Sequence, residues 1–383
     1  MPPQTTAIKS TAWDSSTRSS PVDVGTPIDW MRANLASGWV STAITLALVY
    51  LIVRGVIGFV DWAFMNAVWT LPNGDPQACR DIQGTGACWA VITEKYRFIL
   101  FGTYPFGEQW RAALVCLIFI GLYIVSAMRR FWRKELALVW AVALAAMGIL
   151  MWGGVLGLSS VPQERWGGLP VTLILSTLGL ASAFPIAIFV ALGRRSGMPA
   201  IKAMCVMYVE LVRGVPLISV LFMASVIFPL FLPEGMNIDK LLRAQVAITL
   251  YAAAYLSEVV RGGLQALPGG QHEAADALGL SYWKKTVHII LPQALQMQIP
   301  SLVNTFISFF KDTSLVLIIG IFDLLGTGKA AIVDPAWQNF DVEVYIAVGM
   351  VYFCFCFAMS RYSRRLEVDL NRRPASSTPR GKP

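Results

Sequence analysis

The sequence predicts an all-α protein embedded in a membrane, with about eight transmembrane helices. Only 14% of its 383 residues are charged, whereas about a quarter of residues are charged in typical soluble proteins. Hydrophobic residues make up 56% of the chain, and they gather into stretches close to the ~20 residues that cross ~30 Å of hydrocarbon. Lys and Arg cluster in alternate connections between those stretches, which is typical of membrane proteins with a fixed orientation.

Eight apolar stretches define the expected spans, and the polar segments around them define the expected organisation. The spans are 38–60, 110–128, 136–157, 169–192, 203–232, 242–261, 301–320 and 343–360. Residues 1–36 are polar and lack the apolar stretch of a secretory signal, so we expect an uncleaved tail. Residues 37–157 hold three spans and a long outer loop, residues 158–363 hold five spans, and residues 364–383 form a second polar tail.

Basic residues give the expected orientation, because Lys and Arg close to a span resist transfer across the membrane. Four basic clusters follow the second, fourth, sixth and eighth spans, and alternating spans would bring them to one side. They are Arg129, Arg130, Arg133 and Lys134; Arg194, Arg195 and Lys202; Lys284 and Lys285; and Arg361, Arg364, Arg365, Arg372 and Arg373. We expect that side to be cytoplasmic, with both termini there. The net charge of +8 therefore reflects topology and not nucleic-acid binding, which requires one continuous basic stripe.

Two of the six cysteines lie in the first outer loop. The stretch QACRDIQGTGACWA places glycines between Cys79 and Cys88, so the chain can turn back there. Because the outer side of the membrane is oxidising, a disulfide is one hypothesis, and two free thiols are the other. The remaining cysteines lie in expected spans, where their small apolar character is a sufficient explanation.

Nucleotide-binding and metal motifs fail on their spacing. A phosphate-binding loop reads G-x-x-x-x-G-K-[ST], but around GTGK the sequence has Asp323 at the first glycine position and Ala330 in place of the hydroxyl. The only two histidines, His272 and His288, lack the spacing of a metal site. No nucleophilic residue and general base occur at the sequence spacing of a known catalytic motif. We therefore expect no catalytic residue, no metal, no bound cofactor and no enzymatic activity of the chain alone.

Charged residues inside or beside spans are the first candidates for function, since an unpaired charge in hydrocarbon is costly. They are Arg54, Glu210, Arg213, Glu258, Arg261, Lys311 and Asp312. Glu210 and Arg213 are three residues apart, as are Glu258 and Arg261, so each pair is expected to meet on one helical face. These pairs either stabilise the membrane boundary or contribute to a substrate path.

Two further features favour a path through the membrane. Pro216, within a long apolar stretch, is expected to bend or break its helix, and broken helices at membrane depth line cavities or are buried in protein. Lys311 and Asp312, followed by the hydroxyls of Thr313 and Ser314, offer groups that suit a zwitterion.

The stretch EAADALGLSYWKKTVHIILP, residues 273–292, is a polar interruption between two apolar spans. Alanines with an acid in the first turn predict a short helix from Glu273 to Leu278, which Gly279 would end in the left-handed conformation. Ser281 is placed to cap a second short helix. The two helices either lie flat on the membrane or present a surface to a cytoplasmic partner.

The same stretch is similar to the EAA motif of the inner-membrane permeases of bacterial ABC importers, which reads EAA, three residues, Gly, nine residues, I-x-L-P. Every defined position is matched here, by Glu273, Ala274, Ala275, Gly279, Ile289, Leu291 and Pro292. The flanks YLSEVVRGGLQALPGG and LPQALQMQIPSLVNTFISFFKDTSL resemble the histidine-, glutamine- and glutamate-type permeases, and the resemblance covers roughly residues 165–362. The three earlier spans resemble those of longer permeases for general L-amino-acid uptake.

The resemblance implies an ABC type-1 permease domain over residues 158–363, in a chain without its own nucleotide site. The EAA residues would contact a dimer of cytoplasmic ATP-binding subunits, with Leu291 and Pro292 setting the return into the membrane. A second, unlike permease subunit and a periplasmic amino-acid-binding protein would complete an importer in the bacterial inner membrane. The alternative is an ion-coupled secondary amino-acid transporter, which would use the intramembrane charges as a relay and need no ATPase.

Overall fold

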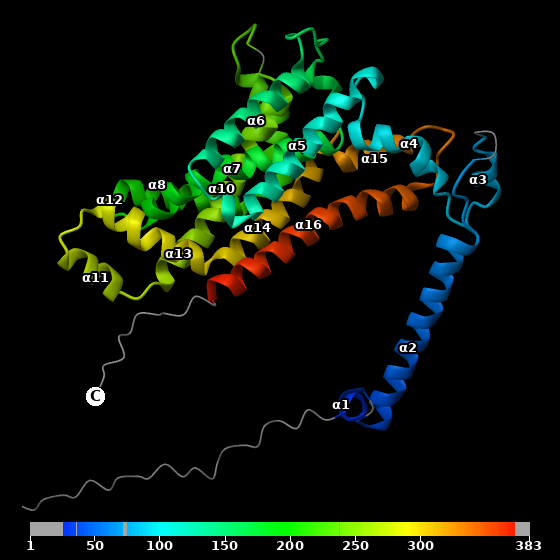
Figure 1. Ribbon diagram of the computed structural model, residues 1–383, viewed down its shortest axis with the longest axis horizontal. Helices are drawn as coiled ribbons and strands as arrows, with labels where there is room; N and C mark the ends of the chain where they lie inside the picture. Colours follow the sequence, from blue (N-terminus) through cyan, green and yellow to red (C-terminus); the bar gives the residue numbers. More distant parts are fainter. Residues whose placement is uncertain (1–25, 36, 72–74, 237, 372–383) are drawn as a thin grey trace, which may run out of the picture. The chain divides into compact units, whose positions relative to one another are not determined.

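The computed structural model describes residues 26–35, 37–71, 75–236 and 238–371, and these residues are almost entirely helical (Figure 1). Their β-structure consists of two isolated bridges, between Val68 and Cys88 and between Gly168 and Asp323. The predicted all-α fold is therefore confirmed. The chain divides into two compact units, the first ending at Ala67 and the second beginning at Val68.

The first unit contains one long apolar helix. Helix α1 (Pro27–Leu35) precedes α2 (Trp39–Val60), and α2 continues into the π-helix Asp61–Met65. The hydroxyl of Thr45 donates to the carbonyl oxygen of Leu35 at 2.8 Å and so ties α1 to α2. The helix from Trp39 to Met65 is long and apolar enough to cross a membrane.

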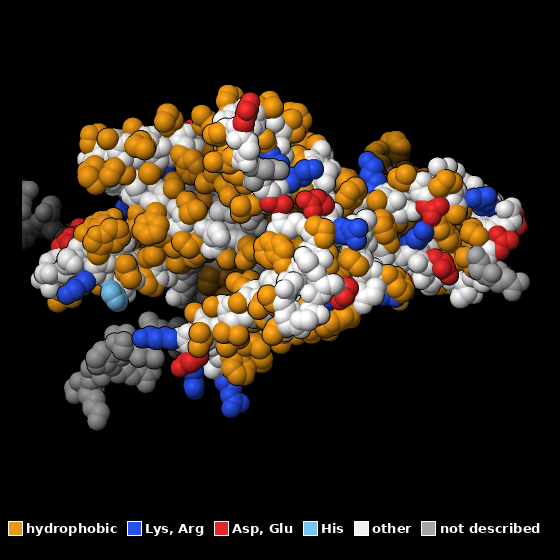
Figure 2. Space-filling view, turned by 90° about the horizontal axis from the view of Figure 1, so that it is seen from above, with side chains coloured by type: hydrophobic (Ala, Val, Ile, Leu, Met, Phe, Trp, Pro, Cys, Tyr) orange, Lys and Arg blue, Asp and Glu red, His pale blue; other side chains and the backbone are white. Residues whose placement is uncertain are grey.

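The second unit holds the remaining helices. In chain order they are α3 (Gln77–Asp81), α4 (Ala90–Phe101), η4 (Phe106–Glu108), α5 (Gln109–Ala127), η5 (Arg129–Phe131), α6 (Glu135–Trp152), η6 (Gln163–Arg165), α7 (Leu169–Arg194), α8 (Pro199–Gly214), α9 (Leu217–Phe222), η7 (Met223–Ile227), η8 (Phe228–Phe231), α10 (Lys240–Ala266), α11 (Gly270–Ala277), α12 (Tyr282–Lys285), η9 (Thr286–Ile290), α13 (Leu291–Met297), α14 (Ile299–Asp312), η10 (Thr313–Ile319), α15 (Leu324–Ala331) and α16 (Asp341–Asn371). Hydrophobic side chains cover much of the face seen in Figure 2, as a bilayer-facing surface requires.

The expected spans correspond to helices of the structure, with differences at their ends. Six described helices are long and apolar enough to cross a membrane, and α8 with α9 makes a seventh, bent by 102°. Helix α10 has 27 residues and occupies the sixth expected span. The third expected span is too long, because α6 ends at Trp152. Gly153, Gly154 and Gly157 follow with positive φ, which a helix does not accommodate.

The break between α8 and α9 follows from Pro216, as predicted. Val215 (φ −111°, ψ 136°) and Pro216 (φ −61°, ψ 143°) are both extended. The proline ring disfavours the helical conformation at the residue before it. The sharp bend separates α8 from α9 and leaves α8 packed against α7 and α10.

Helices α7 and α10 form the centre of the second unit and pack along each other. Their contact depends on small residues, because a Cβ on Gly179 of α7 would lie only 3.1 Å from Cγ2 of Ile248 of α10. Farther along α10, a Cβ on Gly263 would lie 2.5 Å from the carbonyl oxygen of Ala294, so only glycine lets α13 approach this closely. Small residues at such contacts are typical of helices that pack within membranes.

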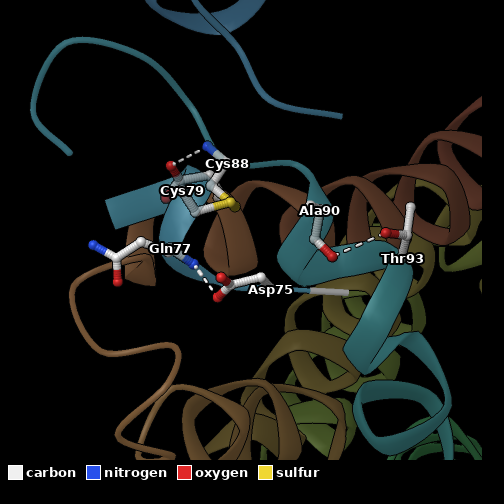
Figure 3. The surroundings of a disulfide bond; sticks show 7 residues. Asp75, Gln77, Cys79, Cys88, Ala90 and Thr93 are labelled. Carbon is white, nitrogen blue, oxygen red and sulfur yellow. Dashed lines mark hydrogen bonds between the residues drawn. A yellow bond between two sulfur atoms is a disulfide. The ribbon is translucent and has the colours of Figure 1, made fainter. Parts of the chain in front are cut away.

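The segment that carries Cys79 and Cys88 packs against α15 and α16. The two cysteines form a disulfide with Cα atoms 5.5 Å apart (Figure 3). The backbone N–H of Cys88 donates to Oε1 of Glu343 in α16 at 3.0 Å, and Oγ1 of Thr327 in α15 donates to the carbonyl oxygen of Ile99 at 2.6 Å.

An ion pair strengthens this contact. Nζ of Lys95 in α4 lies 2.7 Å from Oδ2 of Asp334, and this hydrogen bond holds the pKa of the Asp334 carboxyl below its usual range. Helix α4 is thereby fixed on α15 and α16 by backbone, hydroxyl and charged contacts.

We expect the disulfide to resist alkylation and to stabilise the segment from Val68 to Glu108. Closing a loop of about ten residues lowers the entropy of the unfolded chain by an amount equivalent to roughly 2–3 kcal/mol. Peptide mass spectrometry of unreduced protein should recover Cys79 and Cys88 in one cross-linked peptide. Recovery of both as alkylated thiols would contradict the bond.

Adjacent glycines of α10 should respond oppositely to substitution. Gly263→Ala forces the new methyl group into the carbonyl oxygen of Ala294, and such overpacking typically costs about 1–3 kcal/mol. Gly262 has open space around its Cβ position, so Gly262→Ala should stabilise the helix by up to ~1 kcal/mol. Thermal unfolding in detergent measures both effects, and equal Tm values for the two variants would refute the close contact.

Candidate functional site

Residues 270–285 form a helical hairpin between α10 and α13. The alanines predict the helix α11, and Gly279 was predicted to end it. Gly279 does lie in the left-handed region, at φ +67°. The N–H of Gly279 donates to the carbonyl oxygen of Asp276 at 2.9 Å, and that of Leu280 donates to Ala275 at 3.2 Å, which closes the helix end. Ser281 stands at the N-cap of α12 as predicted, but its hydroxyl forms no capping hydrogen bond.

The hairpin has an exposed tip and a buried inner face. Glu273, Ala274 and Gly279 are exposed, and the apolar side chain of Leu278 is 76% exposed. Ala275 points the other way and is only 1% exposed. Across the turn, Nζ of Lys285 lies 2.6 Å from Oδ1 of Asp276 and braces α12 against α11.

The chain after the hairpin is anchored between the central helices. Ile290 and Ala294 are buried in a cluster with Ala191 of α7 and with Val260 and Leu264 of α10. The other motif residues surround this anchor, since Ile289 and Leu291 pack against the cluster and Pro292 occupies the first turn of α13. The hairpin is therefore connected to α7 and α10 through close-packed side chains.

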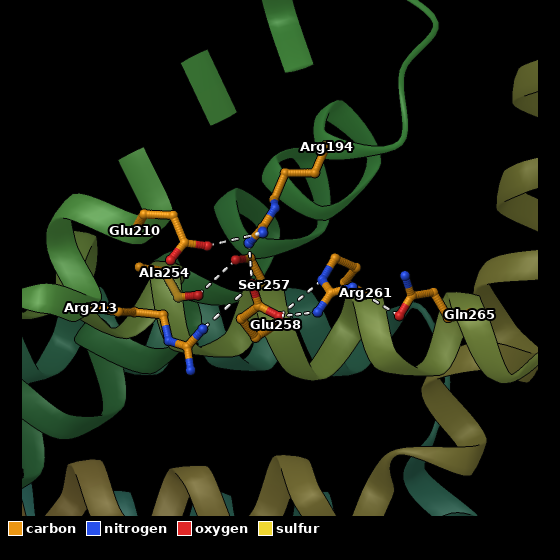
Figure 4. Close-up of polar contacts among 8 residues, drawn as sticks. All are labelled: Arg194, Glu210, Arg213, Ala254, Ser257, Glu258, Arg261 and Gln265. Atoms are coloured by element: carbon orange, nitrogen blue, oxygen red, sulfur yellow. Dashed lines mark hydrogen bonds and ion pairs between the residues drawn. The ribbon is translucent and has the colours of Figure 1, made fainter. Parts of the chain in front are cut away.

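A network of charges lies near this anchor, centred on Glu258 of α10 (Figure 4). Its Oε2 accepts from Nη2 of Arg261 at 2.6 Å, and its Oε1 accepts from Arg194 of α7. Nη1 of Arg213 in α8 lies 3.5 Å from the same oxygen. One carboxylate thus joins three helices.

The structure changes one expected pair and adds a residue. Glu210 does not pair with Arg213; its Oε1 instead lies 3.3 Å from Nη2 of Arg194, and its side chain is 64% exposed. The pair Glu258 and Arg261 forms as expected. Arg194 was interpreted from sequence only as a topology signal, because its partners lie on two other helices.

A polar cavity of about 330 Å³ lies between α10 and α14. Asp312 lines it together with hydroxyl, amide and ring groups, which belong to Tyr251, Tyr255, Asn304, Thr305, Ser308 and Phe309. The guanidinium carbon of Arg213 lies 5.3 Å from the ring centre of Tyr255. An anionic group therefore lines the cavity, and a cationic group stacks on one of its walls.

The other residues of the expected zwitterion site are placed differently. Thr313 is buried, and its hydroxyl donates to the carbonyl oxygen of Phe310 at 2.8 Å. Lys311 is exposed and Ser314 is half-buried, and neither lines the cavity beside Asp312. The sequence order Lys-Asp-Thr-Ser does not bring the four side chains together, because successive helical residues point about 100° apart.

The GTGK stretch has a structural role. It lies within α15, where Gly326 and Gly328 are buried, and a Cβ on Gly328 would lie 2.9 Å from Cγ2 of Val348 in α16. Asp323 caps this helix by accepting from the N–H of Gly326 at 2.9 Å, and burial raises the pKa of its carboxyl. Among the described residues, no group of three or more His, Cys, Asp or Glu side chains is arranged to hold a metal.

Comparison with known proteins places these features in a family. Residues 183–372 match the family model of the binding-protein-dependent transport system inner membrane component. The inner membrane amino-acid ABC transporter permease protein YhdY of Escherichia coli (strain K12) is 46% identical, over 89% of this chain and 92% of its own. The glutamate/glutamine/aspartate/asparagine transport system permease protein BztC of Rhodobacter capsulatus is 37% identical, over 93% and 96%.

Shorter relatives align with about half of the chain. The probable glutamine ABC transporter permease protein GlnP of Bacillus subtilis (strain 168) is 32% identical over 53% of this chain and 92% of its own. A solved structure, the crystal structure of an amino acid ABC transporter with histidines, aligns at 31% identity with a TM-score of 0.47, covering 53% of this chain and 92% of that one. The alignments with YhdY and BztC are long enough to include most of the residues before 158. This chain belongs to the family of binding-protein-dependent transport system inner membrane components, and within it to the amino-acid ABC transporter permeases.

Proposed function

We propose that this permease imports L-amino acids and that α11, Gly279 and α12 form the surface on which a separate ATP-binding subunit acts. The substrate class is supported by the two long relatives, whose names specify amino-acid transport. The coupling role rests on one observation. The hairpin is exposed at its tip, while the segment that follows it is buried between α7 and α10 through Ile290 and Ala294.

This arrangement suits the transmission of a displacement. Close-packed interiors have low compressibility, so a push on Glu273, Ala274 or Leu278 is passed on without being absorbed. The path runs through Ile290 and Ala294 to the ends of α7 and α10. The partner must contact the hairpin differently in two states of the permease, since equal contact would not shift their equilibrium. Ala275, which is buried, would support α11 from inside and not touch the partner.

The same assignment sets the orientation and the assembly that we propose. The side carrying the hairpin and both termini is cytoplasmic, and the disulfide segment faces outward in the bacterial inner membrane. ATP binds to a dimer of partner subunits, a second and unlike permease subunit completes the membrane path, and a periplasmic binding protein delivers the substrate. Residues 158–363 form the permease domain and residues 37–157 an extension, with tails at 1–36 and 364–383.

The cavity at Asp312 is our candidate for part of the substrate path. An amino acid carries an ammonium and a carboxylate group, and Asp312 supplies a partner for the first. Arg213 does not line the cavity itself and also pairs with Glu258, but it stacks on the ring of Tyr255 and is our candidate partner for the second. Glu210 lies outside this cavity, and Lys311, Thr313 and Ser314 would influence it from neighbouring positions.

Gly279→Val should leave the protein inserted but abolish the stimulation of ATP hydrolysis by substrate-loaded binding protein in a reconstituted complex. A β-branched side chain is strained at φ +67°, so the hairpin would lose its turn. Gly197→Val is a matched control, since its Cβ position is equally open and its loop lies outside the hairpin. Equal stimulation in both variants would remove the coupling role.

Asp312→Asn should raise the KM for uptake about 10- to 100-fold, because hydrogen bonds to charged groups contribute about 1.5–3 kcal/mol. Glu234→Gln serves as the control, since Glu234 is exposed and does not line the cavity. Uptake of radiolabelled amino acid into proteoliposomes measures both KM values. An unchanged KM for Asp312→Asn would exclude this carboxylate from the path.

A further inference from the structure

A second cavity, of about 650 Å³, separates α6 from the central pair α7 and α10. Met147, Gly148 and Met151 of α6 line one wall, and Ile174 and Leu178 of α7 line the opposite one. Helix α6 packs on α5, and α5 in turn packs on α7. The extension thus meets the permease domain through α4 and α5, while α6 stands apart from α7 across the cavity.

The gap is held open at its outer end. Arg111 of α5 is fully buried, its Nε donates to the carbonyl oxygen of Leu150 in α6 at 2.6 Å, and its Nη1 donates to that of Ser159 at 2.9 Å. These bonds fix the end of α6 against α5 and prevent it from moving onto α7. Leu144, Met147, Met151, Ile174 and Leu178 line the part of the cavity between α6 and α7, and the polar side chains of Gln163, Glu164, Asp239 and Gln245 also line it. Because an unfilled apolar cavity is costly and an apolar wall offers water no partners, we expect an occupant with an apolar part along α6 and α7 and a polar part beside these side chains.

The depth of the cavity matches one leaflet of a bilayer. Its α6 residues run from Leu144 to Trp152, which is roughly 12 Å at 1.5 Å per residue. The last α7 residue that lines the cavity is Leu178, about 14 Å from the start of α7 at Leu169. Both lengths are close to half of the ~30 Å hydrocarbon core, so the cavity spans the outer leaflet only.

The volume excludes a helix as the occupant. A helix segment as long as the cavity is deep, about 13 Å, and at least 10 Å wide corresponds to roughly 1,000 Å³. The cavity holds about two thirds of that. A narrower occupant with the length of one leaflet is an acyl chain.

A smaller cavity of about 270 Å³ adjoins the first at the outer interface and shares Glu164, Trp166 and Asp239 with it. Lys240 and Arg243 also line this smaller cavity, so its lining contains both acidic and basic side chains. Trp152 and Trp166, whose ring centres lie 5.0 Å apart, mark the level at which tryptophans gather in membrane proteins.

Several of these charged groups remain available for a ligand. Glu164 and Lys240 are exposed and form no ion pair within the part of the chain that the structure describes. Nε of Arg243 is buried without a partner in the described residues, while its Nη1 donates to the carbonyl oxygen of Ser225 at 2.8 Å. The Asp239 carboxylate, in contrast, accepts from the N–H groups of Leu241 and Leu242.

We propose that phosphatidylethanolamine occupies both cavities. One acyl chain fills the apolar cavity between α6 and α7, the phosphate pairs with Lys240 and Arg243, and the ammonium pairs with Glu164. A zwitterionic headgroup fits an acid beside two bases, whereas an anionic headgroup would leave Glu164 unpaired and facing negative charge. The choice of the outer leaflet rests on the orientation proposed above.

Native mass spectrometry of the complex in nanodiscs of equal parts phosphatidylethanolamine and phosphatidylglycerol tests the proposal. The wild-type chain should retain phosphatidylethanolamine, and Gly148→Phe should reduce the retained lipid at least about tenfold, because its ring fills the cavity. Gly121→Phe is the matched control, since the Cβ positions of both glycines are open but only Gly148 lines the cavity. Equal retention in the two variants would overturn the site, and a preference for phosphatidylglycerol would overturn the headgroup assignment.

Wild-type protein provides an independent measurement if a variant fails to fold. A phosphatidylethanolamine with a diazirine on its acyl chain should label peptides containing residues 144–152 and 174–178 above the surrounding helices. Uniform labelling of all lipid-facing helices would contradict a specific site. Because neither readout uses ATP or substrate, a negative result is distinguishable from failure of the import function.

Discussion

Close approach of α7 and α10 is the constraint on which the rest of the second unit depends. Lipid tails are as apolar as Leu side chains, so helices in a bilayer associate through tight packing and gain little from leaving their solvent. Gly179 provides that tight packing on α7, and buried alanines continue it, at positions 183, 187 and 191 of α7 and 244, 247 and 252–254 of α10. Helices α5, α13 and α14 then pack against this pair.

The charges around Glu258 follow from the same constraint. Where α7, α8 and α10 converge, long side chains reach across between helices, and a buried charge is tolerated only with a partner. Glu258 has three arginine partners, so removal of one still leaves the carboxylate paired. The network therefore joins α7, α8 and α10 through a carboxylate with more than one cationic partner.

Features set by one or two neighbouring residues were predictable from the sequence. The left-handed turn at Gly279 and the break at Pro216 depend on local backbone sterics, and both are present. Contacts across helices were not predictable. The spacing of Glu210 and Arg213 allows these two residues to pair. It cannot show that Arg194 lies within reach of Glu210, or Glu258 within reach of Arg213. Similarly, the motif does not distinguish Ala274 from Ala275. Only the packing of the structure shows that Ala274 is exposed and Ala275 is buried.

The contacts of α4 also bear on how the protein is made. Its partners Thr327 and Asp334 lie more than 220 residues later in the chain, so they are synthesised long after α4. The disulfide, in contrast, joins cysteines separated by only 9 positions and needs no later segment. This small ring can therefore close early, whereas α4 obtains its contacts with α15 and α16 only after the last helices have been made. A chain truncated before α15 would leave the buried side chains Val91 and Ile99 of α4 without these contacts.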